Sequence, residues 1–258
     1  MQIKTVQQLN GINTDFYNSI AQEFSDSRNY FWQGWDEILP HLKNPTKNVL
    51  DVGCGNGRFA EFLIKKNFSD FFYSGIDNNE SLLTIAKNQI LSTRIAAEFL
   101  KIDIITELIN RAFNKKVPNK KFDLIVVFGV MHHIPSYKLR LQLLQELTDL
   151  LSENGILVTT FWQFKNNERF LFKQINPEKV GIDQNDLEEN DFILDWQRGK
   201  EAFRYFHHTD ESEQNKLAQN LKNAELISEF YADGKTQKLN KYLIFKKISS
   251  PVTQQTPL

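Results

Sequence analysis

One stretch near the start of the chain combines residue types that suit binding of a nucleoside-like cofactor. Residues 48–60 read Asn-Val-Leu-Asp-Val-Gly-Cys-Gly-Asn-Gly-Arg-Phe-Ala, so that Asp51 precedes three alternating glycines, Gly53, Gly55 and Gly57. Glycine lacks a Cβ atom, which lets the backbone turn sharply and approach a ligand closely. The spacing differs from the Gly-x-Gly-x-x-Gly pattern that cradles a pyrophosphate. Because Asp51 would repel a phosphate group, the stretch favours a cationic ligand.

Further polar groups follow the next apolar runs of the chain, where ligands of open α/β sheets bind. Asp77, with Asn78 beside it, can accept both hydroxyl protons of a ribose. Asp103 can accept from an adenine amine while the amide of Ile104 meets a ring nitrogen, and the carbonyl of Phe128 can meet an ammonium group. Each acid alone is typical of a helix N-cap or a solvated loop. Three acids ending three successive strands favour a cofactor site.

Strands that alternate with helices must position these groups, which predicts an α/β fold with a doubly wound parallel sheet. Apolar runs predict strands at 48–52, 72–76, 98–102, 122–128, 156–161, 226–231 and 241–246. Helical spacing predicts helices at 15–24, 31–39, 58–66, 80–91, 106–113, 137–151 and 213–223.

The same patterns divide the chain into three parts, the second of which contains an insertion. Residues 1–47 are expected to form an N-terminal helical lid over the cofactor, and residues 48–248 the main domain. Between about 162 and 210 the periodicity lapses into a polar and aromatic stretch, which predicts an insertion for substrate recognition. The Pro-, Thr- and Gln-containing residues 249–258 predict a disordered tail.

Composition excludes several classes of protein. The formal net charge of the 258 residues is −1, so no global field draws the chain to nucleic acid or to an anionic membrane. A single cysteine, Cys54, excludes an internal disulfide and a cysteine-rich zinc site. His132 and His133 are adjacent, but no further ligand at metal spacing accompanies them, so we expect no metal. Without a signal peptide or an apolar run of about 18 residues, we expect a cytoplasmic protein that does not enter a membrane.

The glycine stretch and the acids at the strand ends resemble the motifs of class I S-adenosylmethionine-dependent methyltransferases. The resemblance implies a Rossmann-like fold with a seven-stranded, mostly parallel sheet, helices on both faces and an antiparallel last strand. It also implies S-adenosyl-L-methionine as cofactor, which carries a sulfonium and an ammonium but no phosphate. Many members have a similar histidine pair, and His133 is therefore expected beside the cofactor.

Four short segments resemble, more narrowly, the tRNA wobble-uridine carboxymethyl methyltransferases. They are Phe16 to Arg28 followed by Trp32, then residues 160–163, 193–196 and 203–207. The resemblance implies methylation of the carboxylate of 5-carboxymethyluridine in the tRNA anticodon loop, and a small zinc-binding activator protein as in eukaryotic relatives. Asp195 stands where the family commonly has Pro, Phe206 replaces a Tyr, and residues 233–240 lack an Asn-Trp-Trp found in many members.

These segments supply the candidate residues for the methyl acceptor. Arg204, Tyr205 and His207 are expected to bind and orient it, with Trp162 or Trp196 stacking on the uracil. The alternative is that the aromatic residues belong to the core, where Trp and Phe are mostly found. A carboxylate with a pKa of about 4 is already ionised, so the reaction needs no general base.

Two further hypotheses concern the flanks of the site. Tyr17 and Arg28 are expected to close over the cofactor, the alternative being a packed Tyr and a surface Arg. Lys235 and Lys238, on the loop before the last predicted strand, are the candidates for tRNA contacts. Two alternative functions stay open, a methyltransferase acting on a carboxyl, hydroxyl or quinone-type carbon of a small molecule, and a non-catalytic subunit that keeps the fold.

Overall fold

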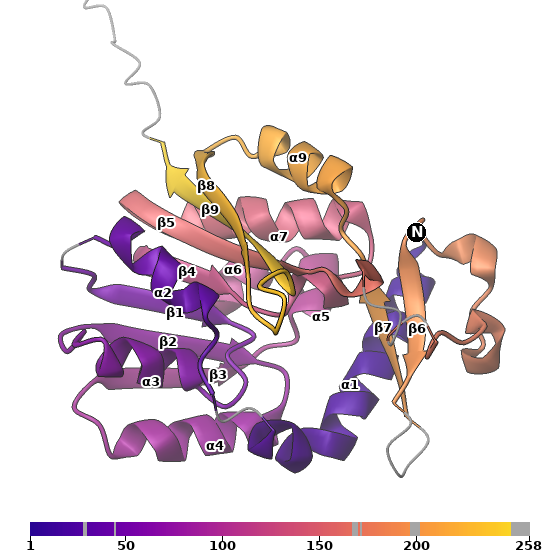
Figure 1. Cartoon of the computed structure of the whole chain (residues 1–258), viewed down its shortest axis with the longest axis horizontal. Helices are drawn as coiled ribbons and strands as arrows, with labels where there is room; N and C mark the ends of the chain where they lie inside the picture. Colours follow the sequence, from indigo (N-terminus) through magenta and orange to yellow (C-terminus); the bar gives the residue numbers. More distant parts are fainter. Residues whose placement is uncertain (28–29, 44, 167–169, 171, 197–201, 249–258) are drawn as a thin grey trace, which may run out of the picture.

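The computed structural model describes residues 1–27, 30–43, 45–166, 170, 172–196 and 202–248. They form a seven-stranded sheet in the order β3-β2-β1-β4-β5-β9-β8 (Figure 1). The strands are β1 (Asn48–Val52), β2 (Phe72–Asp77), β3 (Ala96–Lys101), β4 (Phe122–Val127), β5 (Leu151–Trp162), β8 (Ala224–Ala232) and β9 (Asn240–Lys247). The first five pair in parallel, and β9 runs antiparallel to both β5 and β8. The predicted fold class, with its antiparallel last strand, is confirmed.

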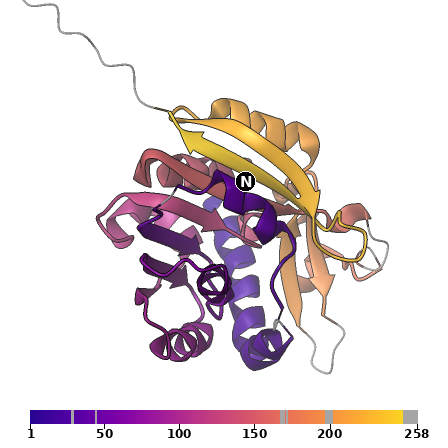
Figure 2. The same cartoon turned by 60° about the vertical axis from the view of Figure 1, so that its left-hand side comes forward.

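Helices cover both faces of this sheet (Figures 1 and 2). One face packs against α2 (Gly34–Ile38), α3 (Arg58–Lys65) and α4 (Glu80–Leu91). The other packs against α5 (Ile104–Ile109), α6 (Phe113–Lys116), α7 (Tyr137–Leu150) and α9 (Glu211–Asn220). Successive strand residues point to opposite faces, so strands buried on both sides must be apolar throughout.

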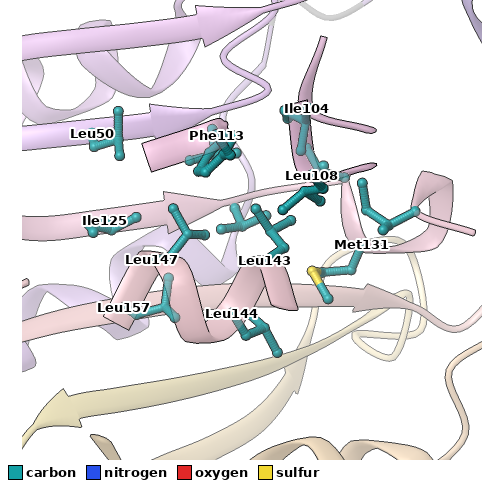
Figure 3. Packing of buried hydrophobic residues seen from close by; sticks show 14 of the residues in the cluster. Leu50, Ile104, Leu108, Phe113, Ile125, Met131, Leu143, Leu144, Leu147 and Leu157 are labelled. Carbon is teal, nitrogen blue, oxygen red and sulfur yellow. The ribbon is translucent and has the colours of Figure 1, made fainter. Parts of the chain in front are cut away.

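Strand β4 illustrates why the apolar runs predict the sheet so well. Leu124 and Val126 join the cluster under α3, while Ile125 and Val127 join the cluster under α7. Figure 3 shows Ile125 beside the leucines of α7 in this second cluster. Because both faces exclude water, the strand end is held rigidly, and the loops that follow the strands are placed by the core.

Helix α1 (Ile3–Asp26) is much longer than the helix predicted at 15–24. It lies beside the carboxyl ends of the parallel strands and alongside β7 (Phe203–His207), as both views show (Figures 1 and 2). Residues 3–14 were missed because Asn10, Gly11 and Asn13 are weak helix formers. Other helices differ from their predicted bounds. Where one helix was predicted at 31–39, the chain forms the short α2 and a 3₁₀ turn at 39–41. Where one helix was predicted at 106–113, Arg111, with φ of 54°, separates α5 from α6.

The insertion contains a second, two-stranded sheet that the sequence analysis did not predict. Its strands are β6 (Asp191–Asp195) and β7, which pair antiparallel, and 3₁₀ turns precede them at 164–166, 177–180 and 184–186. Leu9 of α1 packs against Ile193 and Tyr205, so α1 and the insertion share a small core. The predicted tail at 249–258 lies outside the described residues. Among those that are described, no helix is both long and apolar enough to cross a membrane.

Candidate active site

A cavity of about 1030 Å³ opens at the carboxyl ends of the parallel strands. Its walls come from the loops after β1 to β4, from α1, from the insertion and from the loop between β8 and β9. Most residues singled out from the sequence line it, namely Tyr17, Gly53, Gly55, Asp77, Asn78, Asp103, Ile104, Phe128, His133, Trp162, Trp196, Arg204 and Lys235. Arg28 lies outside the described residues.

The glycine turn after β1 adopts conformations that other residues rarely take. Gly53 has φ of +75°, and a Cβ atom there would lie 2.2 Å from the side chain of Val130. Gly55 has φ of +54° and faces the cavity, where a Cβ would meet nothing within 4 Å. A side chain at Gly55 would therefore fill ligand space. Gly57 does not line the cavity; it precedes α3 and packs closely against Ala86, so its role is in helix packing.

Asp77 is fixed by the backbone of the same turn. Its Oδ2 accepts from the amide of Gly55 at 2.9 Å, and its Oδ1 accepts from the amide of Asn79 at 2.8 Å. Burial raises the pKa of Asp77 even though these amide bonds lower it. Neighbouring Asn78 donates to the hydroxyl of Thr14 on α1 at 3.2 Å. The carboxylate is thus held rigidly at the cavity wall as a hydrogen-bond acceptor.

Asp103 caps a helix and also lines the cavity, where it could accept from a ligand. Its Oδ1 accepts from the amide of Thr106 at 3.0 Å, so it caps α5. Both of its oxygens also accept from the side-chain amide of Asn10 on α1, at 2.8 and 3.1 Å. Since Asp103 and Asn10 both line the cavity, the acid remains a candidate acceptor for a ligand amine.

The structure corrects the role predicted for Asp51. Its side chain is only 3% exposed, does not line the cavity, and its Oδ2 accepts from the hydroxyl of Tyr73 at 2.5 Å. Burial raises the pKa of Asp51 to about 7. Asp51 therefore joins β1 to β2 beneath the glycine turn and lies outside the lining of the cavity.

His133 lies at the centre of a polar contact between three parts of the chain. Its Nε2 is 2.8 Å from the hydroxyl of Tyr17, and its Nδ1 is 3.2 Å from Nδ2 of Asn13 and 3.3 Å from the carbonyl oxygen of Tyr205. Burial, with a smaller contribution from the charge of Arg204, lowers the pKa of His133 to about 3. The ring is therefore neutral at physiological pH. Asn13 gave no signal in the sequence, because its partners come from distant segments.

Arg204 projects into the cavity wall among aromatic rings. Its guanidinium carbon lies 4.6 Å from the ring centroid of Phe206, 4.9 Å from that of Trp196 and 5.0 Å from that of Phe16. Such stacking attracts a cation to the ring faces and fixes its orientation. Trp162 lines the same part of the cavity and makes ring contacts with Phe206 and other residues of the insertion. Trp162 and Trp196 thus pack against neighbouring rings and also line the cavity, while stacking of either ring on a uracil stays a prediction.

Tyr205 and His207 do not line the cavity, which corrects their predicted contact with the methyl acceptor. Their side chains are 0% and 1% exposed. The hydroxyl of Tyr205 donates to Asp191 at 2.6 Å, and the two ring nitrogens of His207 lie 2.7 Å from Asp191 and 2.7 Å from Glu213. Because β7 alternates its side chains, Arg204 faces the cavity while its neighbour Tyr205 faces away.

A buried arginine completes this ionic cluster behind the cavity. Arg140 is 0% exposed and donates to Glu213 at 2.6 Å, to Glu188 at 2.7 Å and to the carbonyl of Ile134 at 2.9 Å. Burial lowers the pKa of His207, but hydrogen bonds to the two carboxylates outweigh it and raise the value above the ordinary one. The cluster ties α7, α9 and the insertion together.

The same cluster contains the one set of metal-ligand types found among the described residues. Glu188, Asp191 and His207 place one ligand atom each within 4.8 Å of one another. However, both nitrogens of His207 face carboxylates, and Glu188 accepts from Arg140 and from the amide of Tyr137. Ion pairs and hydrogen bonds therefore account for the arrangement.

Among the described residues, two lysines line the cavity. Lys235, on the loop between β8 and β9, lines the cavity and is exposed, whereas the exposed Lys238 does not line it. Lys173 of the insertion also lines it and was missed by the sequence analysis, because a lone lysine in a polar stretch gives no signal. Asp233 holds the Lys235 loop by accepting from the amide of Gly34 at 3.0 Å.

Comparisons with known proteins agree with this geometry. A family model described as a methyltransferase domain matches residues 43–225. The chain is 27% identical over 168 residues to a tRNA (carboxymethyluridine(34)-5-O)-methyltransferase of Schizosaccharomyces pombe, covering 64% of each protein. It is 27% identical over 160 residues to a probable tRNA methyltransferase 9B of Bos taurus, 62% of this chain but 31% of that protein. A ubiquinone biosynthesis O-methyltransferase of Coxiella burnetii is 29% identical over 127 residues, 44% of this chain and 50% of that protein.

The chain thus spans less than two thirds of the length of these curated relatives. Among solved structures, an S-adenosylmethionine-dependent methyltransferase of Methanosarcina mazei superposes with a TM-score of 0.60 at 19% identity, over 83% of this chain and 98% of that one. One from Clostridium acetobutylicum gives a TM-score of 0.61 at 14% identity, over 90% and 98%. The chain therefore belongs to the methyltransferase domain family and has the fold of the S-adenosylmethionine-dependent methyltransferases.

Proposed function

We propose that this protein uses S-adenosyl-L-methionine to methylate a carboxylate, and that the acceptor is the carboxymethyl group of a wobble uridine in tRNA. The proposal is supported by the relative from Schizosaccharomyces pombe and by a mouse protein named for the same activity, which is 28% identical over 156 residues. It is also supported by the chemistry of the cavity, which is lined by carboxylate acceptors and by the guanidinium of Arg204.

The residues at the strand ends fit the cofactor. Gly55 leaves space at the wall where any side chain would intrude, and Asp77 presents acceptor oxygens suited to ribose hydroxyls. Asp103 and the amide of Ile104 stand where an adenine amine and ring nitrogen would find partners. The turn after β1 lacks the glycine spacing of a pyrophosphate site, in keeping with a ligand without phosphate. When bound, the cofactor supplies an electrophilic methyl group on a sulfonium.

The placement of Arg204 is the observation that carries the choice of acceptor. A guanidinium held among the rings of Phe16, Trp196 and Phe206 offers a planar cation and flat apolar surfaces side by side. A pyrimidine that carries a carboxylate matches both features, because its ring can stack while its charge meets the guanidinium. Lys173 and Lys235 add positive charge to the lining of the cavity, which would favour contacts with the phosphates of an RNA.

The reaction places modest demands on the protein. A carboxylate with a pKa of about 4 is already a nucleophile at neutral pH, so the chain has no proton to remove. The neutral ring of His133 is consistent with this, since its low pKa makes it a poor base. What remains is to orient the carboxylate and to exclude water, which rigid hydrogen bonds and the aromatic wall around Arg204 can supply.

Transfer of labelled methyl to two RNA samples tests the proposal. We expect tRNA that carries 5-carboxymethyluridine to accept label, and an unmodified transcript of the same tRNA to accept none, because it lacks the carboxylate. Equal labelling of both samples would contradict it. A small zinc-binding activator protein is part of the proposal, and it should be added where the chain alone binds cofactor but transfers nothing.

A small-molecule acceptor is the second candidate. It is favoured by the relative from Coxiella burnetii, by the net charge of −1 and by the acidic segment at 183–195 of the insertion. Label that appears on a small carboxylic acid, hydroxyl or quinol-type compound, with none on tRNA, would support this candidate.

A further inference from the structure

We infer that Phe16 of α1 is a positioning residue: its buried ring holds the guanidinium of Arg204 in place and thereby orients the cation that meets the methyl acceptor. Phe16 is 2% exposed and does not line the cavity, whereas Arg204 does. Phe16 therefore acts on a ligand only through its neighbours. That Arg204 meets the acceptor rests on the proposed function, but the contact between Phe16 and Arg204 does not.

The three rings described around Arg204 come from two parts of the chain. Trp196 directly follows β6 and Phe206 belongs to β7, so both are part of the insertion that also carries Arg204. Phe16 comes instead from α1. The centroid of its ring lies 5.0 Å from the guanidinium carbon of Arg204 and 5.2 Å from the ring centroid of Trp196, with the two ring planes at 76°. One side chain of α1 thus supports both the cation and a ring that packs on it.

Hydrogen bonds fix the position of α1 relative to Arg204. Asn13 lies three residues before Phe16, which places both side chains on the same face of the helix. Asn13 accepts from the amide of Tyr205 at 2.8 Å and donates to the carbonyl oxygen of Tyr205 at 3.2 Å. Since Tyr205 follows Arg204 on β7, α1 holds the backbone beside Arg204 as well as its side chain. Both views show α1 running alongside β7 (Figures 1 and 2).

A ring at position 16 gives Arg204 something that an aliphatic side chain would not. The face of an aromatic ring attracts a cation, so a guanidinium that lies over it is held in one orientation. An aliphatic side chain would fill the space without this attraction. An arginine side chain has several rotatable bonds, and their freedom has to be lost when a ligand binds. The ring of Phe16 therefore lowers the cost of binding by ordering Arg204 in advance.

NMR of the Arg204 side chain tests the inference without any substrate. Its Nε atom is buried, so the Nε–H group is shielded from water and suits measurement, and Arg204→Lys identifies its signal. We expect an ordered Nε–H group in the wild type and a mobile one in Phe16→Leu, measured as a fall in the proton–nitrogen heteronuclear Overhauser effect. An Nε–H group that is equally ordered in both proteins would overturn the inference.

Phe113→Leu is the matched control, because it makes the same change at another buried phenylalanine. Phe113 is 0% exposed, does not line the cavity and packs in the cluster that contains the leucines of α7 (Figure 3). The control should also lose stability, but it should leave the order of Arg204 and methyl transfer unchanged. If Phe113→Leu mobilises Arg204 as much as Phe16→Leu does, the effect reflects general loss of stability, and the inference is wrong.

A second variant covers the case in which Phe16→Leu does not fold. In Phe16→Met the flexible side chain adapts to the space left by the ring but offers no ring face to the guanidinium. It should therefore give a folded protein in which Arg204 is mobile. A Phe16→Met protein in which Arg204 stays as ordered as in the wild type would contradict the role of the ring.

Kinetics measure the consequence for the methyl acceptor. Loss of one ring contact to a cation corresponds to a change of about 3- to 30-fold in a rate or binding constant. We expect Phe16→Leu to lower kcat/KM for the acceptor by such a factor and to leave the dissociation constant of S-adenosylmethionine unchanged. A kcat/KM equal to that of the wild type would overturn the inference.

A double variant separates Arg204 from the other neighbours of Phe16. In the Arg204→Ala background, Phe16→Leu should have no further effect on kcat/KM. Effects that multiply would show that Phe16 acts through another residue, such as Tyr17, whose ring centroid lies 5.1 Å away, and would overturn the inference. If no methyl acceptor is found, the proposed function fails, whereas the NMR experiment still decides whether Phe16 holds Arg204.

Discussion

The side-chain amide of Asn10 donates to both carboxylate oxygens of Asp103, at 2.8 and 3.1 Å. Two further pairs join α1 to the loop after β2, because Asn78 donates to Thr14 at 3.2 Å and Asn79 donates to Asn18 at 3.0 Å. Helix α1 is thus docked on the cavity through polar residues that also serve as candidate ligand contacts. A bound cofactor has to compete with part of this docking.

Removal of the Asn10 amide should therefore strengthen cofactor binding. In Asn10→Ala the oxygens of Asp103 lose a competing donor worth about 1 kcal/mol, so the dissociation constant of S-adenosylmethionine should fall about 3- to 10-fold. Isothermal titration calorimetry measures it, and Gln7→Ala on the exposed side of α1 serves as control. Weaker binding by Asn10→Ala would mean that Asn10 contacts the cofactor itself.

The two acids of the neighbouring strands β1 and β2 should differ sharply when each is replaced by its amide. Asp77→Asn removes an acceptor at the cavity wall and should weaken cofactor binding by at least about tenfold. Asp51→Asn should change it by less than about threefold, because the side chain of Asp51 faces Tyr73 and not the cavity. Calorimetry on both variants decides the matter, and equal losses would restore Asp51 as a ligand contact.

The cluster around His207 should make folding stability depend on pH. Since the pKa of His207 is raised in the folded protein, its stabilisation is complete below the ordinary value of 6.5 and is lost as pH rises through the folded value. His207→Gln should lower the free energy of unfolding by about 3 kcal/mol at pH 6 and by less at pH 9. Urea unfolding at both pH values measures the difference. A loss that is the same at both, or larger at pH 9, would contradict the charged state of His207.

Arg204 should be needed for transfer but not for cofactor binding. Arg204→Ala removes the cation among the rings and should lower kcat/KM by about 100-fold or more, a loss of roughly 3 kcal/mol. Arg204→Lys keeps the positive charge but lacks the planar guanidinium, so its kcat/KM should lie between those of the wild type and Arg204→Ala. Arg94→Ala, at an exposed site, is the matched control. Loss of cofactor affinity in Arg204→Ala would assign Arg204 to the cofactor instead.

The main sheet was predictable because its strands are short apolar runs bounded by polar turns. Short apolar runs of this kind indicate buried strands, as do Val49 and Leu50 before Asp51 and the run from Leu124 to Val127. The same rule located the acids at the strand ends, since ligands bind beyond the carboxyl ends of such strands. Which of these acids faces the cavity was not predictable, because burial of Asp51 depends on Tyr73 of the adjacent strand.

The two-stranded sheet within the insertion and the first half of α1 were missed for a different reason. Tyr205 and His207 alternate with Arg204 on a strand whose facing direction is set by Asp191 and Glu213, and these partners are recognisable only in three dimensions. Likewise, Asn10 and Asn13 disfavour a helix locally and are held in one by tertiary hydrogen bonds. Local helix and strand propensities therefore predict neither the facing direction of the β7 side chains nor the first half of α1.

The most direct test of the central claim follows labelled methyl from S-adenosylmethionine onto tRNA carrying 5-carboxymethyluridine, with mild alkali added afterwards. A methyl ester is cleaved under these conditions, so the account predicts that the label is released as methanol. Label that stays on the RNA would indicate transfer to a base or ribose atom and would contradict methylation of the carboxylate.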